Sequence, residues 1–123
     1  MIARVRLTYS RGGQPVQHVF QLHASRSTQD LLAALPLELT LSNYANTELI
    51  ADLPRRLSTA GTPPSHDARR GDLCYYAPWG NLALFRKDQG KASGLVLLGR
   101  AELGFDAPAL SSPTHARLEA LES

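Results

Sequence analysis

The sequence YYAPWGNLALF, residues 75–85, joins two apolar runs through a turn that contains Pro, Trp, Gly and Asn. Successive side chains of a strand point to opposite faces, so Tyr75 and Tyr76 cannot both enter one core. Trp79 lies in the turn itself, where Pro78 fixes one dihedral angle and Gly80 allows a positive φ. The stretch therefore predicts two strands joined by a stiff turn, with one tyrosine facing away from the core and the indole held at the rim.

These aromatic side chains admit two interpretations that the sequence leaves open. In the first they form the wall of a binding site, because rings on a rim supply flat apolar area together with N–H and O–H groups that orient a partner. In the second, Tyr75, Tyr76 and Phe85 fill a core and Trp79 caps the end of a barrel.

Alternation of apolar and polar residues predicts most of the other elements. It indicates strands over residues 3–9, 16–22, 37–41, 72–77, 82–85 and 95–101. The first two strands flank a turn that contains two glycines, so they read as a hairpin. After the hairpin, Ser27 or Thr28 can cap a short helix that Pro36 ends.

Three segments carry weaker signals. Residues 42–54 fit helical and strand spacing equally well. Residues 58–70 are rich in Ser, Thr, Gly, Pro and charge, and they predict a long loop. We expect residues 106–123 to form a partly ordered tail or a short helix, which Ser112 can cap with Pro113 in its first turn.

Many short strands with one clear helix predict a mainly β fold. We expect a small closed or partly closed β-barrel over residues 1–105, because closure removes exposed strand edges. The length of 123 residues is that of one domain. Regular alternation of strands and helices is missing, which argues against a doubly wound nucleotide-binding fold, and GxGxxG and GxxxxGK loops are also missing.

The composition excludes several classes of partner. The net charge is only +2, and the Arg-Arg pairs at 55–56 and 69–70 lack flanking aromatic residues, so we expect no nucleic-acid binding. Arginines at positions 4 and 6 interrupt the first apolar residues, and no window is long and apolar enough to span a bilayer. We therefore expect a cytoplasmic protein without membrane contact.

No local pattern predicts catalysis, a metal site or a cofactor. Ser65, His66 and Asp67 are consecutive, and side chains adjacent in sequence point apart and seldom form a catalytic relay. The four histidines lack ligand spacing such as HExxH, and the single cysteine, Cys74, has no Cys or His near it in the sequence. Glu48 lies in a segment with few other charges, where it either caps its own loop or presents an acceptor to a ligand.

Three blocks of the sequence resemble the cyclophilin-like domain family of small single-domain prokaryotic proteins. They read LPLELTLSNYANTELIADLPRRLST, GDLCYYAPWGNLALFRKDQG and GLVLLGRAE, and the resemblance covers residues 2–104. It implies a cyclophilin-like barrel in which the segment before the second Leu-Pro is a strand. Leu49, Ala51 and Leu53 would then point inward.

True cyclophilin isomerases carry an arginine in a Phe-His-Arg strand motif and a Phe-Met-x-Gln-Gly-Gly-Asp segment, and neither motif stands in this sequence. The strand that would correspond reads TELIA, with Glu48 near the position of the arginine, while Arg55 and Arg56 follow beyond Pro54. Proline isomerisation needs a donor aimed at the twisting amide. The resemblance therefore implies a non-catalytic binding module, with peptidyl-prolyl isomerase activity as the alternative.

We predict that the protein binds a peptide or a small molecule, as a monomer or a homodimer, with no cofactor and no metal. A competing hypothesis places the aromatic residues, with Leu118 and Leu121, in a subunit interface. The predicted site residues, chosen for aromatic clustering and turn chemistry, are Tyr44, Glu48, Arg55, Tyr76, Trp79, Asn81 and Phe85.

Overall fold

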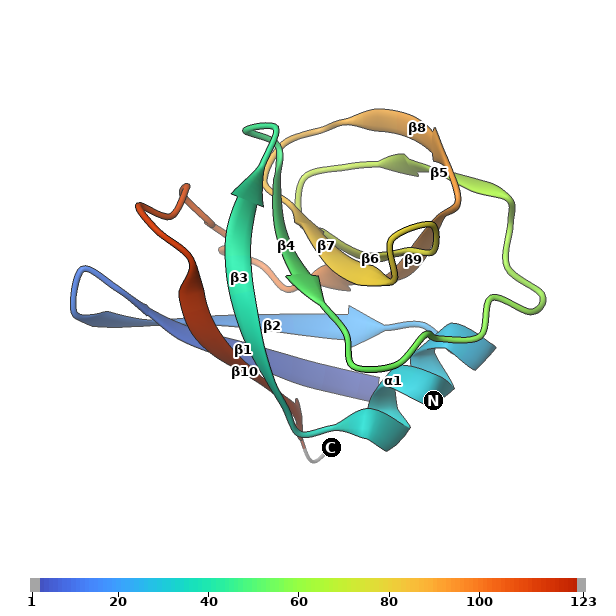
Figure 1. Ribbon diagram of the computed structural model, residues 1–123, viewed down its shortest axis with the longest axis horizontal. Helices are drawn as coiled ribbons and strands as arrows, with labels where there is room; N and C mark the ends of the chain where they lie inside the picture. Colours follow the sequence, from blue (N-terminus) through green and yellow to red (C-terminus); the bar gives the residue numbers. More distant parts are fainter. Residues whose placement is uncertain (1–2, 122–123) are drawn as a thin grey trace.

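The computed structural model describes residues 3–121, and eight of its strands build one closed antiparallel barrel (Figure 1). The barrel strands are β1 (Ala3–Arg11), β2 (Gln14–Leu22), β3 (Leu37–Tyr44), β4 (Glu48–Asp52), β6 (Asp72–Tyr76), β7 (Asn81–Phe85), β9 (Leu95–Ala101) and β10 (Thr114–Leu121). Around the barrel they follow the order β1-β10-β3-β4-β7-β6-β9-β2. The predicted fold class, a mainly β barrel with one short helix after the first hairpin, is confirmed.

The barrel interior follows from period-2 alternation. Residues 48–52, which fitted two periods equally, form β4 with Leu49 and Ala51 buried inside, and Leu53 packs against the same core. Tyr75 enters this core and is 1% exposed, and its hydroxyl oxygen accepts a hydrogen bond from the backbone N–H of Leu57. The strand that the resemblance implied is therefore present, with the implied face inward.

The helix α1 (Arg26–Ala34) closes one end of the barrel, along the lower side of Figure 1. Its Leu31 is fully buried in the barrel core. The cap is Ser25, whose side chain accepts a hydrogen bond from the N–H of Thr28 at 3.0 Å. The predicted cap at Ser27 or Thr28 is wrong, because both residues are buried within the helix.

A second, smaller sheet covers part of the outer face of the barrel, at the top of Figure 1. It pairs β5 (Ser65–Ala68) with β8 (Gly90–Ser93). Both strands lie in segments that the sequence predicts as polar loop or turn, and their four-residue length leaves too little alternation to detect. Between this sheet and the barrel lies a second apolar cluster, formed by Ala68, Cys74, Ala83, Phe85 and Leu95.

The C-terminal residues form a strand, so the predicted terminal helix is wrong. β10 pairs with β1 on one side and β3 on the other, and it closes the barrel. Ala116 and Leu118 both point into the core, and their spacing of two residues is that of a strand. In the sequence alone, the spacing of three residues between Leu118 and Leu121 also fits a helix. Only the two neighbouring strands decide between these periods.

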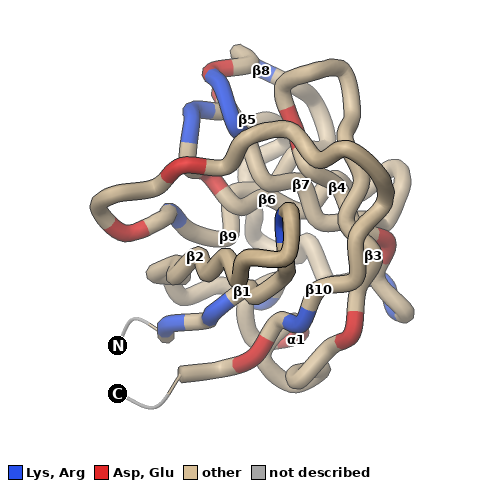
Figure 2. The backbone as a smooth tube through the Cα atoms, turned by 90° about the vertical axis from the view of Figure 1, so that its left-hand side faces the viewer, with Lys and Arg blue, Asp and Glu red and all other residues tan. Residues whose placement is uncertain are grey.

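Figure 2 shows basic and acidic residues interspersed on the side where β1 and β10 lie. Arg6 on β1 faces Glu119 on β10 in the strand register, and their side chains form an ion pair of 3.3 Å. Within residues 3–121, no helix combines the length and hydropathy that crossing a membrane requires.

Candidate functional site

The candidate site lies on the outer face of the barrel, because alternation turns one side of each strand away from the core. On β4 the outward Glu48 and Ile50 alternate with the inward Leu49 and Ala51. On β6 the outward residues include Tyr76, so the two adjacent tyrosines do lie on opposite faces of the strand. β7 turns Asn81, Ala83 and Phe85 outward by the same rule.

These outward side chains line a pocket of about 160 Å³ beside the β5–β8 sheet. It is lined by Tyr44, Glu48, Ile50, Tyr76, Trp79, Asn81, Phe85, Gln89, Ala92 and Leu95. Six of the seven predicted site residues are therefore brought together in one concavity.

Arg55 is the predicted site residue that the structure places elsewhere. With Arg56 it lines a different surface groove of about 600 Å³ beside α1. Arg56 donates from Nη1 to the carbonyl oxygen of Ala77 at 2.7 Å, and its side chain packs over Gly80. Arg56 therefore supports the Pro78 to Gly80 turn and is not part of the pocket lining.

Three aromatic rings form the rim of the pocket. The Trp79 ring lies 5.3 Å from the ring of Tyr44 and 5.3 Å from that of Tyr76, close to perpendicular to each. Such edge-to-face pairs are a favoured arrangement of aromatic rings. Trp79 is nevertheless 53% exposed and Tyr44 42% exposed, so the rim is open to solvent.

Two tight turns place these rings. Ala45 and Asn46 adopt positive φ angles of 52° and 59° in the β3–β4 turn, which puts Tyr44 opposite Glu48 in the strand register. Pro78 lies so close to Gly94 that a Cβ atom on that glycine would meet the proline ring at 2.9 Å. The close approach holds the Trp79 turn against the β8–β9 connection.

Two polar side chains of the lining, Glu48 and Asn81, which we call the base of the pocket, lie beside the buried apolar Phe85 and Leu95. Glu48 is partly buried, and within residues 3–121 its carboxylate has no ion pair and no side-chain hydrogen bond. Burial raises the pKa of Glu48 above its ordinary value, and no cationic neighbour opposes that shift. Asn81 is 2% exposed, and its Oδ1 atom is buried without a hydrogen-bond partner. An unpaired buried acceptor costs about 1–3 kcal/mol, so this base carries unsatisfied capacity for a donor.

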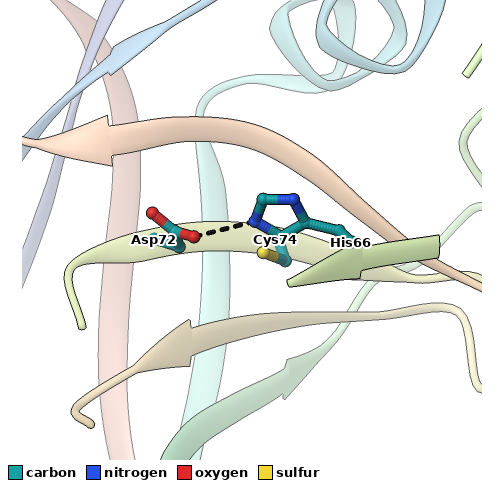
Figure 3. A group of neighbouring side chains, drawn as sticks. All are labelled: His66, Asp72 and Cys74. Atoms are coloured by element: carbon teal, nitrogen blue, oxygen red, sulfur yellow. Dashed lines mark hydrogen bonds and ion pairs between the residues drawn. The ribbon is translucent and has the colours of Figure 1, made fainter. Parts of the chain in front are cut away.

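A second polar cluster lies under β5, where His66, Asp72 and Cys74 gather (Figure 3). Figure 3 shows His66 and Asp72 pointing toward one another, with 2.8 Å between Nε2 and Oδ2. The ligand atoms of all three residues lie within 4.8 Å of one another, although nothing in their spacing along the sequence predicts the cluster. His, Asp and Cys are the donor types that hold Zn²⁺.

The hydrogen bonds of Asp72 favour a structural role for this cluster. Asp72 is 1% exposed, and its carboxylate also accepts hydrogen bonds from the backbone N–H of Arg69 and from Nε of Arg100. Burial raises the pKa of the Cys74 thiol, and the nearby Asp72 carboxylate adds to this shift, so the thiol stays protonated. The cluster therefore joins β5 to β6 and holds the small sheet against the barrel.

The model of the Cyclophilin-like family matches residues 12–119. The chain belongs to this family. Its cyclophilin-like barrel is similar to the solution structure of a hypothetical protein from Archaeoglobus fulgidus, with a TM-score of 0.63 and 17% identity. That likeness covers 98% of this chain and 95% of the other, and at this identity it shows the fold alone. No curated protein matches the chain.

Sequence reasoning missed the side of the pocket that the β8 region of this cyclophilin-like chain supplies. Gln89 and Ala92 come from the segment between the predicted strands over residues 82–85 and 95–101, and Leu95 comes from the start of β9. Only the pairing of β8 with β5 brings that segment over the barrel, so no local signal could have found these residues.

Proposed function

We propose that this cyclophilin-like protein is a non-catalytic binding module whose peptide or small-molecule ligand enters the rim pocket between β4, β7 and β8. One observation carries the proposal. A concavity combines an exposed aromatic rim with a polar base whose acceptors have no partner among residues 3–121. Exposed aromatic surface and unpaired buried acceptors are both unfavourable in the free protein. A ligand that covers the rings and donates to the acceptors would therefore gain binding free energy.

The size of the pocket limits what enters it. A volume of about 160 Å³ lies below the range of about 300–1,000 Å³ typical of drug-sized ligands. It is close to the cavity of about 150 Å³ that holds one benzene molecule. The pocket therefore takes one side chain or one small head group, and the rest of a larger ligand lies over Trp79 and Tyr44.

The charge of the pocket supports binding rather than proline isomerisation. An isomerase stabilises the twisted amide through a positioned donor. Among the ten residues that line this pocket, the charged side chain is Glu48, which accepts hydrogen bonds when it is ionised. Arg55 and Arg56, the nearest candidates in the sequence, line the other groove.

The proposal is tested by two-dimensional NMR on the ¹⁵N-labelled protein with a panel of Xaa-Pro peptides. Trp79 is the single tryptophan, so its indole N–H gives one resonance that reports directly on the rim. We expect peptides to shift the Trp79 indole and Asn81 side-chain resonances, without cis-trans exchange cross-peaks on the peptide. Exchange cross-peaks that appear only with protein would reject the non-catalytic assignment.

Matched variants locate the binding. Trp79→Ala removes the central ring of the rim, whereas Leu103→Ala removes a fully exposed apolar side chain outside the pocket. We expect Trp79→Ala to abolish the shift of Asn81 and Leu103→Ala to retain it. Equal loss in both variants would place binding elsewhere and contradict the proposal.

A further inference from the structure

The rim pocket presents acceptors at its base and aromatic rings at its mouth. Ionised Glu48 carries acceptor oxygens only, and the buried Oδ1 of Asn81 is a second acceptor without a partner. Because both groups accept, the ligand atom that reaches them must donate. A ligand that placed its own carboxylate or phosphate there would face Glu48 across a partly desolvated space, where like charges repel strongly.

The net charge of the pocket is negative. The ten lining residues include no Lys, Arg or His. Arg86 directly follows the lining residue Phe85 in the sequence, but its side chain is engaged elsewhere. Its Nε donates to the carbonyl oxygen of Ala107 and its Nη1 to that of Asn46. The Glu48 carboxylate therefore lacks a counter-ion among residues 3–121, although burial penalises its charge.

The rim adds a second attraction for positive charge. Tyr44, Tyr76 and Trp79 are neighbours, and the electron-rich faces of such rings attract ammonium groups. Groups of aromatic rings recognise alkylated ammonium ions in this way. Donors do exist on the rim, in the Tyr hydroxyl groups and the Trp79 indole, but all of them are neutral.

We infer that the rim pocket binds an alkylammonium group, the protonated amine of a small molecule or of a lysine side chain. This inference rests on the proposed function and names its ligand class. The ammonium donates hydrogen bonds to the Glu48 carboxylate, beside the Asn81 side chain. Its alkyl stem lies between the rings of the rim. A four-carbon stem with one ammonium matches a pocket of about 160 Å³, which is benzene-sized.

The experiment titrates n-butylammonium chloride into the ¹⁵N-labelled protein and follows the Trp79 indole and Asn81 side-chain resonances. n-Butanol at the same concentrations controls for the apolar stem, and potassium chloride controls for ionic strength. We expect saturable shifts with n-butylammonium alone. Equal shifts with n-butanol would show an apolar site, and equal shifts with potassium chloride would show charge screening, and either result overturns the inference.

Two variants separate the direct contact of Glu48 with the ammonium group from the electrostatic field of the protein as a whole. Glu48→Gln keeps the size of the side chain and removes its charge. Asp52→Asn removes an equal charge from an exposed position on the same strand, outside the pocket. We expect Glu48→Gln to weaken n-butylammonium binding about tenfold or more, because a charge-assisted contact is lost. Asp52→Asn should change it less than about twofold, and equal weakening in both variants would overturn the inference.

The peptide Ac-Gly-Lys-Gly-NH2 distinguishes the two sources of the ammonium group. Binding at least tenfold tighter than that of n-butylammonium would support a lysine side chain in a peptide, and equal affinity would support a small amine. Xaa-Pro peptides without lysine provide the link to the proposed function. If they shift Trp79 while n-butylammonium does not, the alkylammonium inference fails and the binding module stands. If no probe shifts Trp79, both fail.

Discussion

Replacing Asn81 with leucine should stabilise the fold while it removes a polar group from the pocket. Asn81 is 2% exposed on β7, and its Oδ1 atom has no hydrogen-bond partner. Leucine has the same number of side-chain heavy atoms, branched at the same carbon, and suits a buried strand position at least as well. The substitution therefore removes a buried acceptor without breaking a hydrogen bond to it.

The magnitude follows from the burial and from the missing partner. An unsatisfied buried acceptor costs about 1–3 kcal/mol, so Asn81→Leu should raise the free energy of unfolding by about that amount. For a domain of this length, 1 kcal/mol corresponds to a Tm change of about 4 °C. The expected rise in Tm is therefore about 4–12 °C, and alkylammonium binding should weaken in the same variant.

Asn43 on β3 is exposed and serves as the control for lost hydrogen bonds, because its amide is paired on both sides. Nδ2 donates to the carbonyl oxygen of Leu110 at 2.6 Å, and Oδ1 accepts from the N–H of Leu110 at 3.0 Å. Asn43→Leu should lower the free energy of unfolding by about 1–2 kcal/mol. Urea unfolding of both variants, with m-values compared, measures these changes. Destabilisation of Asn81→Leu to the same extent as Asn43→Leu would refute the unpaired state of the Asn81 oxygen.

Four further predictions test the barrel and the charges that hold it. Gly99→Ala should lower the free energy of unfolding by more than about 3 kcal/mol in urea, because the new Cβ would overlap with the backbone carbonyl oxygen of Gln21. A smaller loss would contradict this contact. Asp72→Asn should lower the free energy of unfolding by about 2–4 kcal/mol, since the carboxylate joins His66 to Arg100. Hydrogen exchange should become faster in β5 and β8 first, and equal acceleration in all strands would argue against that role. Burial lowers the pKa of His18, so the neutral imidazole contributes stability above a pH of about 6.5 that is lost as the pH falls below it. Urea midpoints at pH 7.5 and 5.0 should therefore differ less in His18→Gln than in the parent protein. Burial raises the pKa of Glu48, so its charge destabilises the fold at high pH and protonation relieves this as the pH falls through the raised pKa. Glu48→Gln should therefore be more stable than the parent at pH 7.5, by a small margin because the carboxylate is partly solvated, and equal stability would contradict the burial of that charge.

A glycine control separates steric overlap from backbone strain in the Gly99 prediction. Gly13 has a φ of +80° and nothing within 4 Å of its missing Cβ atom. Gly13→Ala should therefore cost only the conformational penalty of about 1–2 kcal/mol. Equal losses at the two glycines would show that close approach at the β2–β9 contact contributes nothing.

Much of the pocket could be predicted from the sequence because its residues follow local rules. Alternation alone separates Tyr75 from Tyr76, and turn chemistry alone exposes Trp79. The outward position of Glu48 does not follow from periodicity, which is ambiguous in residues 42–54. Only the resemblance favours a strand there. Arg55 was misplaced, since the sequence does not say which way the chain leaves β4.

Other features carried no local signal. The strands β5 and β8 are four residues each and polar, so their pairing became visible only in the structure. β10 offered both strand and helix spacing, and its neighbours β1 and β3 lie far from it in the sequence. The contact of His66 with Asp72 likewise depends on β5 folding back over β6.

By itself, the sequence determined the mainly β fold, the position of the helix, the inward face of the strands that alternate clearly, and the placement of Trp79 in a stiff turn. These properties depend on alternation and turn residues, which act over a few positions. Only the tertiary structure decided which strands meet, that the C-terminal strand closes the barrel, and that Glu48 and Asn81 are left without partners. Those properties depend on contacts between segments that are distant along the chain, and burial and hydrogen bonding are determined by the complete set of such contacts.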